Sequence, residues 1–139
     1  YEYHVDLREK QQGFSRRNTC HYPEELDIEE MERAAGYLLG RHDFSSFTDR
    51  KDEKGCTRRI DEIQIEKRGD SLCMSFRGNG FMYHMVRILS GTLLEVGSGK
   101  KSARDIPEIL KAKSRACAGF LAPAQGLFLK EVYYQDEQR

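Results

Sequence analysis

The most apolar stretch of the chain runs from Asn79 to Gly97, and its pattern predicts a buried helix. Large apolar side chains recur in it at spacings of three and four residues. This periodicity places them on one wide helical face, which must pack against a core. The residues of this face are Met82, Met85, Val86, Leu89, Leu93 and Val96.

A different face of the same predicted helix carries His84, Arg87 and Gly91. A basic stripe therefore ends at a residue without a side chain, where another group can approach the helix backbone. An arginine in such an apolar helix is costly unless its guanidinium meets a carboxylate, a phosphate or water, because an unpaired buried charge loses its hydration. We therefore expect Arg87 to have a partner.

The first residues alternate between apolar and polar, which predicts a strand containing Tyr1, Tyr3, Val5 and Leu7. The alternation begins at residue 1 without an initiator methionine, so we expect the chain to be part of a longer protein. Tyr1 and Tyr3 share the inward side of this strand. Each ring could pack in a core or, alternatively, stack on a nucleic-acid base.

The polar segment 8–23 is expected to form a long surface loop. Asp27 then caps a helix, with Glu30 completing a capping box, and Gly40 ends it. The expected buried stripe of this helix consists of Met31, Ala34, Ala35 and Leu38.

Two alternating segments, Thr57–Lys67 and Leu72–Gly78, predict a β-hairpin. Shorter elements complete the pattern. They are a compact turn at His42–Phe47, a helix that Ser102 or Asp105 caps, a turn at Ala122–Gly126, a last strand at Leu127–Tyr134 and a frayed tail from Gln135 to Arg139.

The predicted order of elements favours an α+β fold, with a mostly antiparallel sheet and helices packed on one face. The chain of 139 residues, 38% of them hydrophobic, is long enough for one domain with a core and too short to expect two. The other sheet face would stay free. Many nucleic-acid binders and many unrelated enzymes share such an arrangement, so the fold alone does not decide the function.

Charged residues make up 33% of the chain and cancel to a net charge of zero, which neither favours nor excludes a polyanionic partner. No apolar run is long enough to span a membrane, and no signal-like start is present, so we expect a soluble, cytoplasmic protein. Reduced thiols fit this location, because the cysteines are far apart and form no Cys-x-x-Cys pair. They are Cys20, Cys56, Cys73 and Cys117.

Several kinds of site find little support in the sequence. His4, His21, His42, His84 and the cysteines show no zinc-ligand spacing, Cys20-His21 being the nearest approach, so we expect no metal site. No Gly-x-Ser-x-Gly motif indicates a nucleophilic serine. Gly78-Asn79-Gly80 could attract an anion before a helix, but it lacks the further residues of a nucleotide loop. We interpret it mainly as a turn that needs positive φ angles.

Basic residues gather on the predicted hairpin and the helix after it, where they could form a positive face for phosphates. Asp61, Glu62 and Glu66 lie close enough in the sequence to neutralise this face, and charge alone does not choose between the two interpretations. The basic residues are Arg58, Arg59, Arg77, His84 and Arg87.

Four motifs, in order and with fitting spacing over nearly the whole chain, resemble the C-terminal domain of the tRNA pseudouridine synthase A family. The family's Tyr-x-Tyr strand is matched by Tyr1-Glu2-Tyr3, and its Gly-x-His-Asp-Phe-Ser-x-Phe block by residues 40–47. Its Gly-Asn-Gly-Phe-x-Tyr-His-Met-Val-Arg block is matched by residues 78–87, followed by Gly91, Leu94 and Val96-Gly97. Its closing motif is matched by residues 122–129.

The resemblance implies an isomerase that converts uridines of the tRNA anticodon stem-loop to pseudouridine without metal or organic cofactor. It also implies a homodimer and a separate N-terminal domain that supplies the nucleophilic aspartate. Gly40-Arg41-His42-Asp43 is only superficially like the family's aspartate motif, because Phe44-Ser45 replaces what should follow, and Asp43 is not assigned as the nucleophile. By itself, the chain is expected to be inactive.

Position by position, Tyr1 resembles the tyrosine whose ring packs on the target base, and Arg87 resembles the arginine that pairs with the catalytic aspartate. Leu127 resembles the apolar wall of the pocket. Residues at four other family positions could contact RNA or only shape the cleft; these are His42, Asp43, Asn79 and His84. The alternatives to an enzyme half are a non-catalytic RNA-binding module and a structural dimerisation domain.

Overall fold

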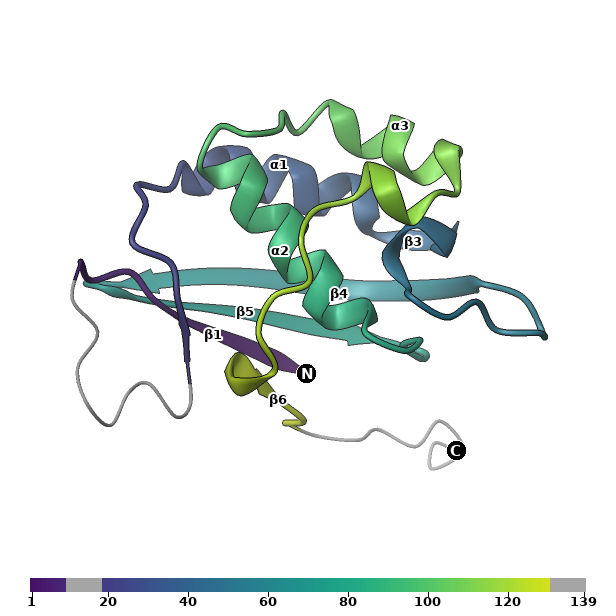
Figure 1. The fold of residues 1–139 in the computed structure, drawn as a ribbon, viewed down its shortest axis with the longest axis horizontal. Coiled ribbons are helices and arrows are strands. Elements are labelled where there is room, and N and C mark those ends of the chain that lie inside the picture. The colour runs from purple at the N-terminus through teal and green to yellow at the C-terminus, as the bar shows by residue number, and fades with distance from the viewer. Residues whose placement is uncertain (10–18, 131–139) are drawn as a thin grey trace.

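The computed structural model describes residues 1–9 and 19–130. The predicted loop over 8–23 and the predicted last strand therefore lie partly outside the described residues, and the predicted tail lies wholly outside them. Within these two ranges, three helices lie on one face of a mostly antiparallel sheet, as Figure 1 shows, so the α+β prediction is confirmed.

The described sheet has the strand order β2-β1-β5-β4-β3, with β6 also paired to β1. All its pairs are antiparallel except β1 with β2. The strands are β1 (Glu2–Asp6), β2 (Cys20–His21), β3 (Gly40–Asp43), β4 (Thr57–Arg68), β5 (Ser71–Gly78) and β6 (Leu127–Phe128).

The hairpin of β4 and β5 contains the two longest strands of the described sheet, and its prediction is confirmed. Gly69, at a φ of 57°, and Asp70 form the turn that joins Arg68 to Ser71. A register shift between Ile60 and Glu62 marks a β-bulge. Because a bulge inserts one residue, it lets Ile60 point to the core although its spacing to Ile63 breaks the period of two.

Helix α1 (Ile28–Leu38) has the predicted N-cap and the predicted buried stripe. The Asp27 carboxylate accepts from the Glu30 backbone N–H at 3.1 Å. The predicted capping box is incomplete, because the Glu30 carboxylate does not accept from the N–H of Asp27. Glu30 instead accepts from the N–H of Ala103, and the N–H of Asp27 donates to the carbonyl of Gly97. These bonds tie α1 to its neighbours in the tertiary structure.

Helix α2 (Met85–Gly97) is the centre of the domain, with only Arg87 and Glu95 not fully buried. It begins at Met85, so the predicted start at Asn79 is wrong. Residues 79–84 form an irregular connection, and His84 occupies the N-cap with a φ of 63°. Met82 is still buried, which explains why the apolar pattern extended too far upstream.

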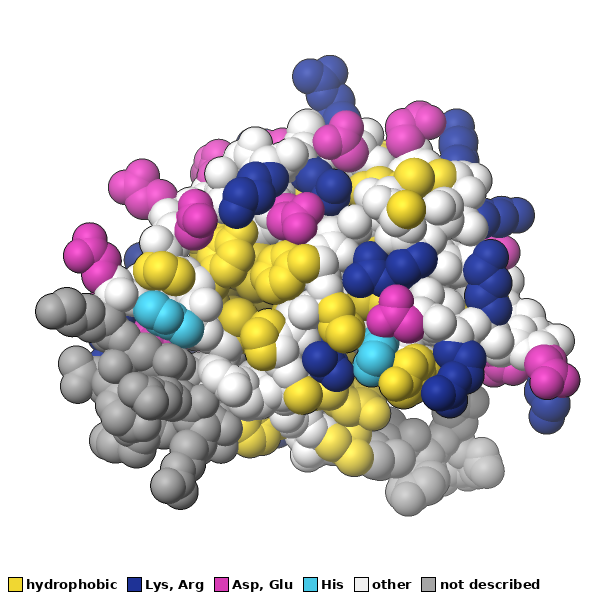
Figure 2. Space-filling view, viewed as in Figure 1, with side chains coloured by type: hydrophobic (Ala, Val, Ile, Leu, Met, Phe, Trp, Pro, Cys, Tyr) yellow, Lys and Arg dark blue, Asp and Glu magenta, His cyan; other side chains and the backbone are white. Residues whose placement is uncertain are grey.

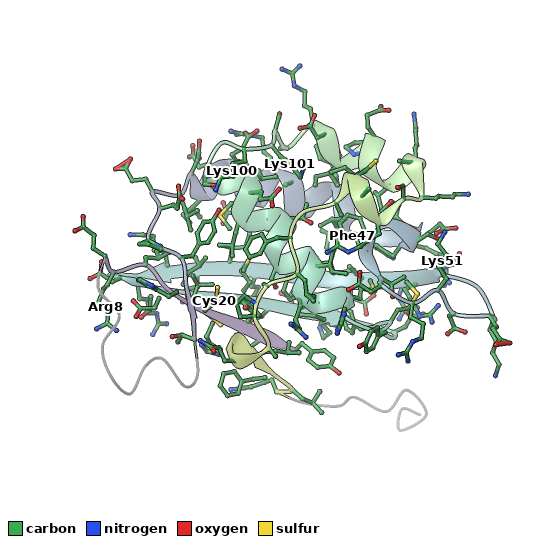
Figure 3. All side chains as sticks on the ribbon, viewed as in Figure 1. Arg8, Cys20, Phe47, Lys51, Lys100 and Lys101 are labelled. Atoms are coloured by element: carbon green, nitrogen blue, oxygen red, sulfur yellow. The ribbon has the colours of Figure 1, made fainter. Side chains whose placement is uncertain are left out.

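The remaining helices are α3 (Asp105–Ala112) and three 3₁₀ turns, η2 (Ser45–Phe47), η3 (Arg115–Cys117) and η4 (Ala124–Gly126). The predicted turn at His42–Phe47 is partly wrong, because His42 and Asp43 belong to β3 and only the following residues form η2. Phe44 and Phe47 are fully buried as anchors, and Phe47 lies on the helix side of the sheet (Figure 3).

Candidate functional site

Arg87 projects from the first turn of α2 and is half-buried. Its Nε donates to the carbonyl oxygen of Ala122 at 2.7 Å, and the Arg87 carbonyl accepts from the Ala122 N–H at 3.3 Å. Among the described residues, no carboxylate lies within ion-pair distance of its guanidinium. The expected partner is therefore, within this part of the chain, a backbone carbonyl.

Gly91 lies one turn further along α2 and lets another segment touch the helix, as predicted. A Cβ at this position would overlap the carbonyl oxygen of Phe120, and one at Gly119 would overlap the backbone of Thr92. The segment 118–122 thus crosses α2 in direct backbone contact, which Figure 1 shows as the chain passing from α3 down to β6. This crossing holds the Ala122 carbonyl against Arg87.

Tyr1 borders a groove of about 510 Å³ at the end of β5. Its ring meets Phe81 edge to face, with centroids 5.5 Å apart. Of the predicted site residues, Tyr1, Arg77 and Asn79 line this groove. The full lining consists of Tyr1, Glu2, Glu62, Gln64, Ser75, Phe76, Arg77, Gly78, Asn79, Gly80, Phe81, Leu129 and Lys130.

Tyr3 and Leu127 lie beside each other in the pairing of β1 with β6. Tyr3 is fully buried and donates to the carbonyl of Pro123 at 2.6 Å, so its ring is a core side chain rather than a base-stacking one. Burial raises the pKa of this phenol far above its usual value. Leu127 is half-buried and packs against the core.

Acidic groups pair with most of the predicted basic residues, and Arg59 and Arg77 share Asp61 as a partner. Arg58 meets Asp52 at 2.8 Å and Arg59 meets Asp61 at 2.7 Å. Arg77 contacts Asp61 and Glu62. The geometry thus favours a neutralised surface, and Figure 2 likewise shows basic and acidic side chains interspersed on the visible face. Exposed pairs of this kind contribute only about 0–1 kcal/mol, so a phosphate could still displace the acids.

The sequence pattern placed His84 on one helical stripe with Arg87. In the structure, His84 instead lies at the N-cap of α2 and pairs with Asp49. Its Nδ1 lies 2.7 Å from the Asp49 carboxylate, which also accepts from Nε of Arg115 at 2.8 Å. The pKa of Asp49 is lowered, first by the bond to His84. Tyr83 stacks on the His84 ring with centroids 3.7 Å apart and carries the Arg50 guanidinium over its own ring.

Gly78 and Asn79 continue the pairing of β5 with β4. The Asn79 side-chain oxygen accepts from the Arg59 N–H at 2.8 Å, and the Asn79 N–H donates to the Arg59 carbonyl at 3.0 Å. Neither Gly78 nor Gly80 has a positive φ, so that part of the sequence interpretation is wrong. Gly78 is required instead because a Cβ there would overlap the Arg59 carbonyl.

His42 and Asp43 make local bonds that shape the end of β3. The His42 Nε2 lies 2.8 Å from the Leu39 carbonyl, and the Asp43 carboxylate accepts from the Ser45 N–H and hydroxyl. The bond to the Ser45 hydroxyl is the first cause of the lowered pKa of Asp43. These contacts fit a structural role.

Sequence reasoning missed Phe81 beside Tyr1, the Ala122 carbonyl at Arg87 and Asp49 at His84. It also missed a group of possible metal ligands, Glu2, His4 and Cys73, which the strand pairing brings together. Apart from the spacing of Glu2 and His4 on one strand, these contacts have no sequence signal, because they join segments that are distant in the chain. Within the described ranges, no helix has the length and apolar character needed to cross a lipid bilayer.

Comparison with known proteins gives one consistent result. The family model for tRNA pseudouridine synthase matches residues 34–135. The proteins named tRNA pseudouridine synthase A from Bacillus pumilus, Halalkalibacterium halodurans and Acetivibrio thermocellus are 46%, 48% and 42% identical over 137, 128 and 135 residues. These alignments cover 98%, 91% and 96% of this chain, but 56%, 49% and 55% of the relatives.

The chain therefore spans about half the length of the curated relatives that it matches. The match covers the segments that carry Arg87, His84 and the Gly78–Gly80 connection, all of which lie between residues 34 and 135. On this match, the chain belongs to the tRNA pseudouridine synthase family.

Proposed function

We propose that this chain is the C-terminal half of a cytoplasmic tRNA pseudouridine synthase that isomerises uridines of the anticodon stem-loop. The chain supplies Arg87 and the surface around Tyr1, and an N-terminal domain supplies the nucleophilic aspartate. The observation that carries this proposal is the state of Arg87. Its guanidinium is half-buried and oriented by Ala122, but it meets no carboxylate among the described residues.

The contact with Ala122 suits Arg87 for a second partner. Only Nε has a hydrogen bond within the described chain, so both terminal nitrogens can form a bidentate pair with a carboxylate. A guanidinium beside an aspartate in a partly dry site keeps that aspartate ionised. An ionised carboxylate is what a nucleophilic aspartate requires.

Tyr1 fits the proposed contact with the target base. Its ring is half-buried and braced by Phe81 at the groove, which also carries the polar side chains of Asn79 and Arg77. A ring held in this way can pack against a uracil at little cost in conformational entropy. Leu127 forms the apolar wall, and His84 and the arginines at positions 58, 59 and 77 contribute RNA-facing surface.

The experiment is release of tritium from tRNA that carries 5-tritiated uracil. The full-length protein should release tritium, whereas the 139-residue chain alone should release none at the same concentration. Turnover by the chain alone would refute the division of roles between the two halves. Sizing of the full-length protein by light scattering tests the homodimer that is part of the same proposal.

A non-catalytic RNA-binding module is the second candidate, favoured by the sheet face that the helices leave uncovered (Figure 1). Gel shifts of this chain with unmodified tRNA over a range of salt concentrations separate the two. Tight, steeply salt-dependent binding by the chain alone supports the module. Weak binding by the chain, with tight binding by the full-length protein, supports the enzyme half.

A further inference from the structure

Three potential metal ligands meet on the sheet face opposite the helices. His4 of β1 and Cys73 of β5 are direct cross-strand partners, and Glu2 precedes His4 by two residues and so points to the same face. Their ligand atoms all lie within 4.8 Å of one another. The three side chains are partly buried.

The separations are close to those of a tetrahedral metal site. His4 Nε2 lies 3.0 Å from Glu2 Oε1 and 3.9 Å from Cys73 Sγ. Tetrahedral zinc, with bonds of about 2.0–2.3 Å, places its ligand atoms roughly 3.3–3.6 Å apart. The His4–Cys73 separation is thus already close to this range, and an adjustment of the Glu2 and Cys73 side chains, whose ligand atoms lie within 4.8 Å of each other, would bring all three atoms to bonding distance.

The surroundings also suit a divalent cation. Glu66 on β4 lies opposite Cys73 and adds a second carboxylate near Glu2. The local charge is thus acidic, opposed by Lys130, whose Nζ lies 4.0 Å from Glu2. Phe128 packs its ring edge to face against His4, with centroids 4.9 Å apart, and limits the rotation of the imidazole.

We propose that Glu2, His4 and Cys73 bind a zinc ion that links β1 to β5. A donor set of thiolate, imidazole and carboxylate favours zinc over magnesium or calcium, which prefer oxygen ligands alone. With three protein ligands, the fourth position of the tetrahedron is left to water, and the ion takes no part in isomerisation. Because Glu2 follows Tyr1 directly, the ion fixes the strand end that carries the proposed base-packing ring.

The test is cobalt(II) titration of the reduced 139-residue chain, because cobalt replaces zinc and reports a thiolate ligand by a sulfur-to-metal charge-transfer band. We expect this band together with the intense d–d bands of tetrahedral cobalt, and we expect zinc to displace both. Cys73→Ser, which preserves the side-chain shape, should abolish the charge-transfer band. His4→Gln should weaken cobalt binding by about tenfold or more.

Cys117→Ser is the matched control, because Cys117 is the exposed thiol of the chain, away from the cluster, and this variant should keep the full signal. Lys130→Met should tighten binding by about two- to fivefold, because it removes the competing cation. Circular dichroism verifies that each variant is folded. Absence of the charge-transfer band in the parent chain, or a band that survives Cys73→Ser, overturns the proposal. Neither result depends on isomerase activity, so the proposed function is tested separately.

Discussion

At the scale of single residues, Asp6 forms a bidentate ion pair with Arg8. It is buried at the end of β1, and its carboxylate accepts from the backbone N–H and from both Nε and Nη2 of Arg8. Arg8 is labelled in Figure 3. The side-chain bond to Arg8 is the main reason why the pKa of Asp6 falls from 3.8 to about 2.

This contact predicts a pH dependence of stability. Because the folded pKa of Asp6 is below its unfolded value, the stabilisation is complete above pH 4 and is lost as the pH falls toward 2. We expect a loss on the order of 1–2 kcal/mol, allowing for the partial exposure of Arg8. Urea unfolding between pH 7 and pH 2 measures it. The Asp6→Asn variant should be less stable at pH 7, and its free energy of unfolding should fall less between pH 7 and pH 2. A fall as large as that of the parent chain would contradict the assignment.

Arg87 shows how far residue-scale prediction could go. Its apolar surroundings in the sequence sufficed to predict a partner, since a buried guanidinium must be satisfied. The identity of that partner could not be predicted, because the Ala122 carbonyl reaches Arg87 only through the crossing of segment 118–122 over α2. The pairing of His84 with Asp49 could not be predicted either, because these residues are 35 positions apart and meet only in the folded structure.

At the scale of elements, segment 118–122 can cross α2 in backbone contact only because Gly91 has no side chain. Gly91 lies where any Cβ would overlap the Phe120 carbonyl. In α1, by contrast, a Cβ at Gly36 would meet nothing within 4 Å. The two helices thus offer a matched pair of glycines, one required by packing and one not.

We predict opposite effects of alanine at these two positions. Gly91→Ala should lower the free energy of unfolding by about 1–3 kcal/mol, because segment 118–122 must move away from α2. Gly36→Ala should raise it by about 0.5–1 kcal/mol, because alanine is the better helix former. Urea unfolding of both variants at neutral pH measures this difference. Equal effects of the two substitutions would show that the contact at Phe120 is not a close one.

Long periodic elements were predictable, and their ends were less so. The apolar and alternating patterns identified α1 and the hairpin of β4 and β5, which each bury one face, and also α2, which buries nearly all of its residues. The start of α2 was missed because Met82 is buried without being helical. Strand β2 was missed because a two-residue strand has no measurable period, and it exists only through its parallel pairing with Val5 and Asp6.

At the scale of the whole molecule, the net charge of zero has a local counterpart, because arginines on and beside the hairpin are paired with carboxylates. Arg58, Arg59 and Arg77 each pair with a carboxylate, so the hairpin, as far as the structure describes it, presents no strongly positive surface. The chain also spans only about half of its relatives. Both observations are expected under the proposal that this chain completes an RNA site together with further polypeptide.

The central claim is that Arg87 holds a carboxylate from outside this chain, and the rate of tritium release by the full-length protein tests it most directly. Arg87→Ala should lower the rate by at least about 100-fold while tRNA affinity in a gel shift changes little, because the pair acts on the nucleophile. Arg87→Lys should be intermediate, since lysine keeps the charge but loses the fork of donors. A near-normal rate for Arg87→Ala would contradict the account.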